Sequence, residues 1–200
     1  MTDVPVRQVR AAFAEETLTV FQAFPAVIAE PAVRAATLVA PFTRERMTWI
    51  KPSFLWMMYR SGWATKRGQE RILSIEITRA GFEWALAHAC LSHFESGTYA
   101  SQVAWIERKR VSPVRVQWDP DRSVVLGPVA WRAIQVGLSG AAVNRYVDEW
   151  IVGIDDITSR VRHIGGLVER GDLRSATEEL PIEMPYPLAP DVAAVIGASR

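Results

Sequence analysis

A change of hydrophobic period between residues 71 and 91 is the sequence feature that most constrains the fold. Residues 71–78 (RILSIEIT) alternate apolar and polar side chains, which is typical of a strand with one buried face. Residues 80–91 instead repeat apolar side chains at helical spacing. The apolar positions of this predicted helix are Phe82, Ala85, Leu86, Ala89 and Cys90. The chain therefore combines strands and helices.

Patterns elsewhere predict further elements of both kinds. Strands are expected at residues 17–24, 47–50, 114–118, 131–138 and 150–154. Helices are expected at residues 25–36, 53–62, 140–146 and 156–170, and a turn at Asp119-Pro120-Asp121. The helix at 53–62 is apolar on nearly every side, which indicates a buried helix. Strands and helices do not alternate regularly, so we predict an α+β fold, with a mixed or mainly antiparallel sheet of about six strands and with four to five helices.

The domain organisation predicted from length and composition is simple. The 200 residues, 49% of them hydrophobic, suit one globular domain, which we expect to cover residues 1–180. Residues 181–200 form a proline-rich tail that either wraps the surface in an extended form or is mobile. The chain has eight tryptophans, which is consistent with a ligand-lined cleft or with a Trp-rich core.

Cysteine content and hydropathy indicate the compartment. Cys90 is the single cysteine, so no intramolecular disulfide can form, which fits a reducing environment. Residues 1–10 lack the apolar stretch of a signal peptide, and no apolar run approaches the roughly 18 residues of a membrane span. We therefore expect a cytoplasmic protein with no membrane partner, and the oligomeric state stays open.

Sequence motifs for common chemistries are absent. The chain contains no G-x-G-x-x-G, no Walker loop, no H-E-x-x-H and no G-x-S-x-G. His88, Cys90 and His93 lie close in sequence, but positions 88 and 93 are roughly 140° apart on a helix and do not converge on one metal. We therefore predict no metal site, and no cofactor is firmly implied.

Charge is unevenly distributed along a chain whose net charge is only +1. Residues 44–71, here called the basic–aromatic segment, carry seven basic and two acidic side chains, a local charge of +5. Residues 148–183 carry nine acidic and four basic side chains, a local charge of −5. The two regions either face each other, or the basic one faces an anionic ligand.

The basic–aromatic segment carries the main functional prediction. Arg46 and Lys51 flank a short predicted strand, and a helix begins at Pro52-Ser53, where free backbone amides favour an anion. An anion pocket at Arg46, Lys51 and Ser53 is therefore expected. Aromatic and basic side chains that follow on the segment complete the predicted ligand site: Trp49, Trp56, Tyr59 and Arg60. The alternative interpretation is a buried helix whose arginines are neutralised by the acidic region.

Three further positions are candidates outside the segment. Gln22 is a polar group on the apolar face of the first strand, so it is either a ligand-orienting amide or a core glutamine bonded to the backbone. Gln135 precedes Gly137, and a glycine within a strand marks either a bulge or a close approach of a ligand. Glu149, at the start of a predicted strand, supplies a carboxylate.

Seven blocks of sequence resemble a known family. They are TVFQAF, RMTWIKPSFLWMMYRSGW, ERILSIEITRAGFEWAL, LSHF, VQWDP, RAIQVGL and YVDEWIVGIDDIT. Together they resemble the domain-of-unknown-function family numbered 4291, over about residues 7–158. The resemblance implies no reaction. Phe21 and Phe24 stand where we expect the family to carry tyrosines.

The order of elements is also similar to that of ADP-ribosyltransferase domains. That resemblance implies a split antiparallel sheet that grips NAD as substrate, with Gln22 and Ser53 on the nicotinamide riboside. It further implies that Arg46 and Lys51 hold the pyrophosphate, that Trp49 or Trp56 stacks on a ring, and that Glu149 is the catalytic carboxylate. The chain departs from that pattern, because Gln22 replaces the usual histidine or arginine and no Q/E-x-E pairing lies near Glu149.

Three functional hypotheses follow from these residues. The first is a transferase or hydrolase that acts on a nucleotide such as NAD, with ADP-ribosyl transfer as the specific reaction that the resemblance implies. The second is a non-catalytic nucleic-acid or nucleotide-binding module, whose affinity would fall steeply with salt. The third is a protein-interaction domain with a Trp-rich surface.

Overall fold

The computed structural model describes residues 4–199. The strands are β1 (Arg10–Ala11), β2 (Thr17–Phe24), β3 (Thr48–Ile50), β4 (Arg71–Thr78), β5 (Ala89–Leu91), β6 (Val114–Arg122), β7 (Pro128–Leu138), β8 (Ile151–Asp156) and β9 (Met184–Pro185). The helices are α1 (Ala26–Ala35), α2 (Phe54–Ser61), α3 (Arg79–Ala87), α4 (Gln102–Val111), α5 (Ala141–Arg145), the π-helix η1 (Tyr146–Trp150), α6 (Thr158–Glu169), α7 (Leu173–Glu178) and α8 (Pro190–Val195).

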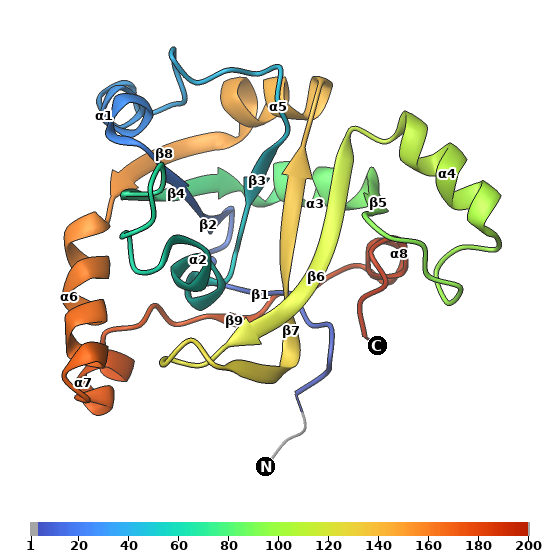
Figure 1. Ribbon diagram of the computed structural model, residues 1–200. Coiled ribbons are helices and arrows are strands. Elements are labelled where there is room, and N and C mark those ends of the chain that lie inside the picture. Colours follow the sequence, from blue (N-terminus) through green and yellow to red (C-terminus); the bar gives the residue numbers. More distant parts are fainter. Residues whose placement is uncertain (1–3, 200) are drawn as a thin grey trace.

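Two main sheets form the centre of the molecule (Figure 1). One has the strand order β2–β4–β8 and is antiparallel, and the other has the order β3–β7–β6–β5 and is antiparallel except where β5 pairs with β6. The sheets meet at Phe21 and Lys51, whose backbones exchange N–H···O bonds of 2.7 and 3.3 Å. The predicted α+β class with mixed and antiparallel pairing is confirmed, with more short elements than expected.

One hydrophobic core joins both sheets through α3. Phe82 and Leu86 of α3 pack with Ile75 of β4 and with Val116 and Val136 of the other sheet, and all five are buried. The alternation of 71–78 produces this arrangement, because Leu73, Ile75 and Ile77 point to the core while Glu76 is exposed. A second core lies between α2 and α6.

The helix α2 is buried on most of its surface, as its sequence predicts. Phe54, Trp56, Met57 and Met58 are each at most 5% exposed. Burial so complete explains why the segment has apolar residues on every side. Arg60 is the exposed position near its end. The side of α2 that carries Tyr59 and Arg60 therefore faces the candidate site described below.

Two local predictions are wrong. The helix expected to run to residue 91 ends at Ala87, because residues 89–91 form the edge strand β5 on Val114–Val116. Ala89, Cys90 and Leu91 are all buried, so an apolar run that short fits either period. The turn expected at Asp119-Pro120-Asp121 is part of β6, which continues to Arg122. The chain reverses instead at Ser123–Gly127, where Ser123 N donates to Gly127 O.

The predicted strand at 150–154 is confirmed as β8, Ile151–Asp156, with its start shifted by one residue. Trp150 belongs to the π-helix η1, and β8 begins at Ile151. Glu149 therefore lies in a helical turn before the strand. The inserted residue of the π-turn turns Tyr146 and Trp150 into the core, where both are buried, and leaves Glu149 exposed.

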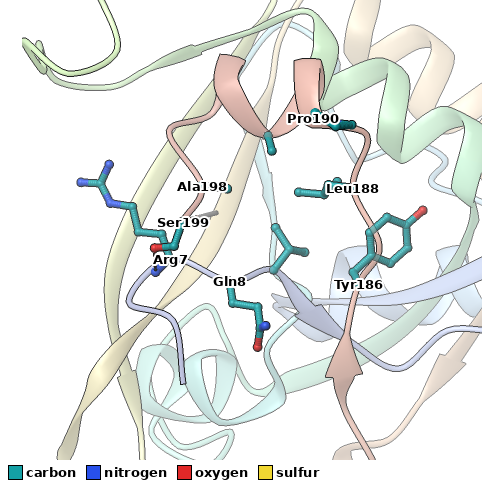
Figure 2. A pocket seen from close by; sticks show the side chains of 9 residues that line it. Arg7, Gln8, Tyr186, Leu188, Pro190, Ala198 and Ser199 are labelled. Atoms are coloured by element: carbon teal, nitrogen blue, oxygen red, sulfur yellow. Dashed lines mark hydrogen bonds between the residues drawn. The ribbon is translucent and has the colours of Figure 1, made fainter. Parts of the chain in front are cut away.

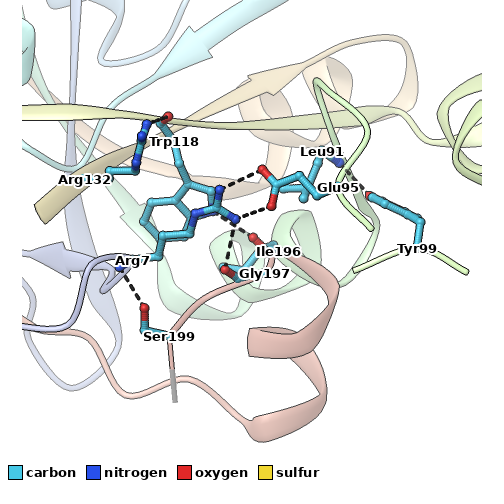
Figure 3. Close-up of polar contacts among 9 residues, drawn as sticks. All are labelled: Arg7, Leu91, Glu95, Tyr99, Trp118, Arg132, Ile196, Gly197 and Ser199. Atoms are coloured by element: carbon cyan, nitrogen blue, oxygen red, sulfur yellow. Dashed lines mark hydrogen bonds and ion pairs between the residues drawn. The ribbon is translucent and has the colours of Figure 1, made fainter. Parts of the chain in front are cut away.

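The C-terminal residues 181–199 pack against the domain. β9 pairs with β1, and the buried Tyr186 makes edge-to-face contacts with Phe13 and Phe82. In Figure 1 this red segment crosses below α2 and leads to α8. Figure 3 shows the two ends of the chain held together, with Arg7 donating to Ser199, Gly197 and Glu95.

Among residues 4–199, no helix is long and apolar enough to cross a membrane.

Candidate functional site

Two adjoining cavities beside α2 form the most polar and basic hollow among those described, here called the basic cleft. Their volumes are about 520 and 200 Å³, and they share Trp49, Lys51 and Arg60. The larger is also lined by Trp56, Tyr59, Gln117, Asp119, Pro120, Arg122 and Gln135. The smaller is also lined by Gln22, Ala23, Phe24, Met47, Thr48, Met57 and Gln69. The cleft thus collects side chains from β2, β3, α2, β6 and β7.

Lys51 lies where the two cavities meet. It follows β3, and its backbone pairs with Phe21, which fixes its position between the sheets. The residue is 7% exposed, and its ammonium donates one long hydrogen bond of 3.3 Å, to the carbonyl of Trp49. Burial and the neighbouring Arg60 lower the pKa of Lys51 to about 8, an effect that Asp119 partly opposes. No ion pair joins Lys51 to a carboxylate of residues 4–199.

A stack of two aromatic rings and a guanidinium forms one wall of the larger cavity. Trp56 and Tyr59 stack with centroids 5.3 Å apart, and the guanidinium carbon of Arg122 lies 3.5 Å from the Tyr59 centroid. Trp56 Nε1 and Arg122 Nε are buried and have no hydrogen-bond partner in the described structure. Buried donors are nearly always paired, so two unpaired ones in the same wall require an explanation.

Trp49 presents the other aromatic surface of the cleft. Gly137 of β7 lies under its ring, and a Cβ built there would come within 3.0 Å of two ring atoms. The glycine in the strand is therefore explained by close approach of Trp49 and Met47. Replacement of Gly137 by any residue with a side chain would push the Trp49 indole into the cleft.

Asp119 supplies the carboxylate of the cleft. Gln117 Nε2 donates to its Oδ1 at 3.0 Å, and Gln135 Nε2 donates to its Oδ2 at 2.6 Å. Gln117 and Asp119 lie two residues apart on β6, and Gln135 is opposite Gln117 on β7, so all three project from one face of the sheet. Gln135, predicted from sequence, is therefore part of the cleft as a group that fixes Asp119.

Gln22 is a core residue at the floor of the smaller cavity. Its Nε2 donates to Thr48 Oγ1 at 2.7 Å and to Trp49 O at 3.2 Å, and its Oε1 accepts from Tyr146 at 2.8 Å. All of these bonds are internal. Burial also raises the pKa of the Tyr146 hydroxyl well above its ordinary value, so this hydroxyl stays protonated and donates.

The start of α2 is closed, so the expectation of exposed amides there is wrong. Ser53 caps the helix by accepting from Trp56 N, and its hydroxyl donates to Asp121 Oδ1 at 2.9 Å. Phe54 N donates to Glu183 Oε1 at 2.6 Å, so the C-terminal segment supplies a carboxyl oxygen to the helix start. The predicted anion pocket at this point is already filled by the protein's own acid.

Burial affects both acids at the helix start. Burial chiefly, together with the nearby Asp121, raises the pKa of Glu183 to about 8. Burial also raises the pKa of Asp121, against the hydrogen bonds from Arg122 N and Ser53. Arg10 binds the carbonyl of Glu183 at 3.1 Å and lies close enough to lower both acid pKa values.

Besides Ser53, two predicted site residues lie outside the basic cleft. Arg46 is exposed and lines neither cavity. Glu149 is also exposed, and its carboxylate lies 3.8 Å from Arg145 in an ion pair on the helix surface. The structure therefore brings together Gln22, Trp49, Lys51, Trp56, Tyr59, Arg60 and Gln135, and leaves Arg46, Ser53 and Glu149 out of the cleft lining.

A separate cavity of about 420 Å³ lies between the two ends of the described chain (Figure 2). It is mostly apolar, and its cation is already paired. Arg7 binds Glu95 through two nitrogens and also reaches Gly197 O (Figure 3). In contrast to the basic cleft, this cavity offers no unpaired charge to a ligand.

A family model described as Domain of unknown function (DUF4291) matches residues 8–186, which is most of the chain. The chain belongs to the DUF4291 family. No curated protein and no solved structure matches it. The similarity to ADP-ribosyltransferase domains therefore stays a prediction.

The sequence prediction missed three polar groups of the cleft in this DUF4291 chain, Gln117, Asp119 and Arg122. All three lie on β6, more than 50 residues after Lys51, and no motif links them to the basic–aromatic segment. The alternation of 114–118 was the available signal, because it places Gln117, and then Asp119, on the polar face of the strand. The expected turn at Asp119 hid this continuation.

Proposed function

We propose that the basic cleft binds the phosphate groups of a nucleotide, with NAD or ADP as representative ligands. The observation that carries this proposal is Lys51, a lysine that is 7% exposed and has no carboxylate counter-ion in the described structure. Buried charges in proteins are normally paired. A phosphate placed between Lys51, Arg60 and Arg122 supplies the missing partner.

The energetics support an anion. A pKa lowered from 10.5 to about 8 means that charged Lys51 costs the folded protein roughly 3 kcal/mol at pH 7. A bound anion lowers that cost, because its negative charge stabilises the protonated form of Lys51. The unliganded protein is thus destabilised by charged Lys51, and anion binding relieves part of that cost. Functional sites commonly carry such a cost in stability.

Size and shape support a nucleotide among anions. The larger cavity, of about 520 Å³, lies within the roughly 300–1,000 Å³ that is typical of ligand pockets, and the cavity of about 200 Å³ adjoins it. Trp49 offers a partly exposed indole to a base, and Arg60 and Arg122 line the larger cavity with Lys51 as cations for phosphate oxygens. The face of Trp56 itself is covered by Tyr59 and Arg122, so Trp49 is the better stacking surface.

Nucleotide binding is better supported than ADP-ribosyl transfer. The carboxylate that the resemblance implies as catalytic, Glu149, does not line the cleft. Transfer of ADP-ribose therefore remains the finer hypothesis, and nicotinamide release from NAD tests it directly. A nucleic-acid module using the same cleft is a separate outcome, marked by affinity that falls steeply with salt.

Calorimetric titration of NAD and ADP tests the proposal, with three proteins compared. Lys51→Met removes the buried charge at similar size, and Arg46→Ala removes an exposed charge of the same segment outside the cleft. We expect Lys51→Met to weaken binding by about 10- to 100-fold, as for loss of a charged hydrogen bond, and Arg46→Ala to change it less than about twofold. Equal effects of the two substitutions, or no binding of either nucleotide by the unmodified protein, would refute the proposal.

A further inference from the structure

Asp119 is a carboxylate held in a fixed orientation inside a basic cleft. Each of its oxygens accepts from one glutamine amide, at 3.0 Å from Gln117 and 2.6 Å from Gln135. An ionised carboxylate has about four acceptor positions, so roughly two remain directed away from these amides. Asp119 lines the large cavity of the basic cleft and also a third cavity of about 220 Å³ beyond it.

Asp119 forms no ion pair within residues 4–199, in contrast to several other acids. Glu95 is bound by Arg7, and Asp148 and Asp156 are bound by Arg44 and Arg71. Lys51 is close enough to be influenced by Asp119, yet the two form no ion pair, and the amides hold both oxygens in place. Two glutamines thus keep a carboxylate available in a site built for anions.

The chemistry of such a carboxylate determines what part of a ligand meets it. A phosphate against Asp119 would be repelled, so the contacting group must donate hydrogen bonds. In a nucleotide the donors nearest to the phosphates are the hydroxyls of the ribose. Carboxylates serve as ribose 2′-hydroxyl acceptors in other nucleotide sites, where an acid stands beside the phosphate-binding groups.

We infer that Asp119 accepts hydrogen bonds from the ribose hydroxyls of the bound nucleotide, so that the cleft selects ribonucleotides over 2′-deoxyribonucleotides. This inference rests on the proposed nucleotide binding. Gln117 and Gln135 are positioning residues, which act through the carboxylate that they orient. Phosphates then lie toward Lys51 and Arg122, with the sugar at Asp119.

The test compares ADP with 2′-deoxy-ADP by calorimetry. The unmodified protein should bind ADP about 10- to 100-fold more tightly, the range expected for a hydrogen bond to a charged acceptor. Asp119→Asn should bring the two affinities to within about threefold. Gln135→Met, which frees one carboxylate oxygen to turn toward Lys51, should reduce the preference to an intermediate value.

Each outcome has one meaning. Binding of ADP and 2′-deoxy-ADP with equal affinity by the unmodified protein overturns the inference and leaves nucleotide binding intact. Retention of the full preference in Asp119→Asn overturns it as well. Inosine diphosphate is a third arm, because a preference for ADP over it that disappears in Asp119→Asn would assign the carboxylate to the base amino group instead. Absence of binding by any of these nucleotides overturns the proposed function and the inference together.

Discussion

The start of α2 and the side of α2 that faces the basic cleft differ in whether their polar groups have hydrogen-bond or ion-pair partners. At the helix start, Ser53 and Glu183 accept from backbone amides, and Asp121 accepts from Ser53. Along its side, Trp56 Nε1 has no partner and Lys51 has no counter-ion in the described part of the chain. A helix N-terminus therefore binds an external anion only when the rest of the fold leaves its backbone amides without partners.

The cations of the basic–aromatic segment likewise include some that form ion pairs and some that do not. Arg44 pairs with Asp148, and Arg71 pairs with Asp156, both in the acidic region 148–183. Lys51 and Arg60 face the cleft without such partners. Internal neutralisation, one of the two alternatives drawn from the charge pattern, therefore holds for Arg44 and Arg71, and an anionic ligand at Lys51 and Arg60 is the proposal.

The largest effect is expected from the acid at the closed end. Because the folded protein raises the pKa of Glu183 from 4.5 to about 8, the stability that its protonated form contributes is lost as pH rises through this window. Glu183→Gln stays neutral and should unfold with a free energy higher by up to about 4 kcal/mol at pH 8, and unchanged near pH 4. Urea unfolding at pH 4, 6 and 8 measures this.

The control for that experiment is Glu178→Gln, since Glu178 is an exposed acid paired with Arg174 on α7. It should alter the free energy of unfolding by less than about 0.5 kcal/mol at every pH. An equal pH dependence in the Glu183→Gln and unmodified proteins would show that Glu183 is ionised in the fold.

A smaller effect of the same kind is expected at the open side. Lys51→Met should raise the free energy of unfolding by about 2 kcal/mol at pH 7, because it removes an unpaired buried charge. The pKa of Lys51 is lowered from 10.5 to about 8, so the penalty is complete below pH 8 and disappears by about pH 10.5. Stabilisation together with lost nucleotide affinity would mark Lys51 as functional, whereas destabilisation would mark it as structural.

The smallest effect concerns the helix cap. Ser53→Ala should lower the free energy of unfolding by about 1 kcal/mol and leave nucleotide affinity within about twofold, because Ser53 serves the helix and not the ligand. Ser101→Ala removes the corresponding cap of α4 and is the matched control. A selective loss of affinity in Ser53→Ala would restore the helix start as the ligand site.

Sequence predicts most of the long elements, but it missed the ten-residue helix α4, and it predicts the short elements poorly. The strands at 17–24 and 71–78 are recognisable because eight alternating residues are hard to mistake. The edge strand Ala89–Leu91 has three buried apolar residues, which fit a helix or a strand equally, and only pairing with β6 decides. Likewise the π-helical turn at Tyr146–Trp150 depends on packing in the core.

For the site, the sequence supplies residue types but not partners. Trp49, Lys51 and Arg60 come from one segment, so their proximity was predictable. Glu183 and Asp119 reach α2 and the cleft from distant segments, and these contacts decide which candidate stays open. No local pattern contains that information.

We propose that a bound anion pairs with buried Lys51, and the most direct measurement is the number of protons taken up when ADP binds. At pH 8 unliganded Lys51 is about half neutral, and an anion raises its pKa, so binding should take up roughly 0.5 proton per ADP. Phosphate, whose second pKa is about 6, is already ionised at pH 8 and contributes little. Calorimetry in two buffers of different ionisation enthalpy measures the uptake. We expect an uptake of roughly 0.5 proton per ADP for the unmodified protein and about zero for Lys51→Met. ADP binding by the unmodified protein without proton uptake would show that the anion does not pair with Lys51.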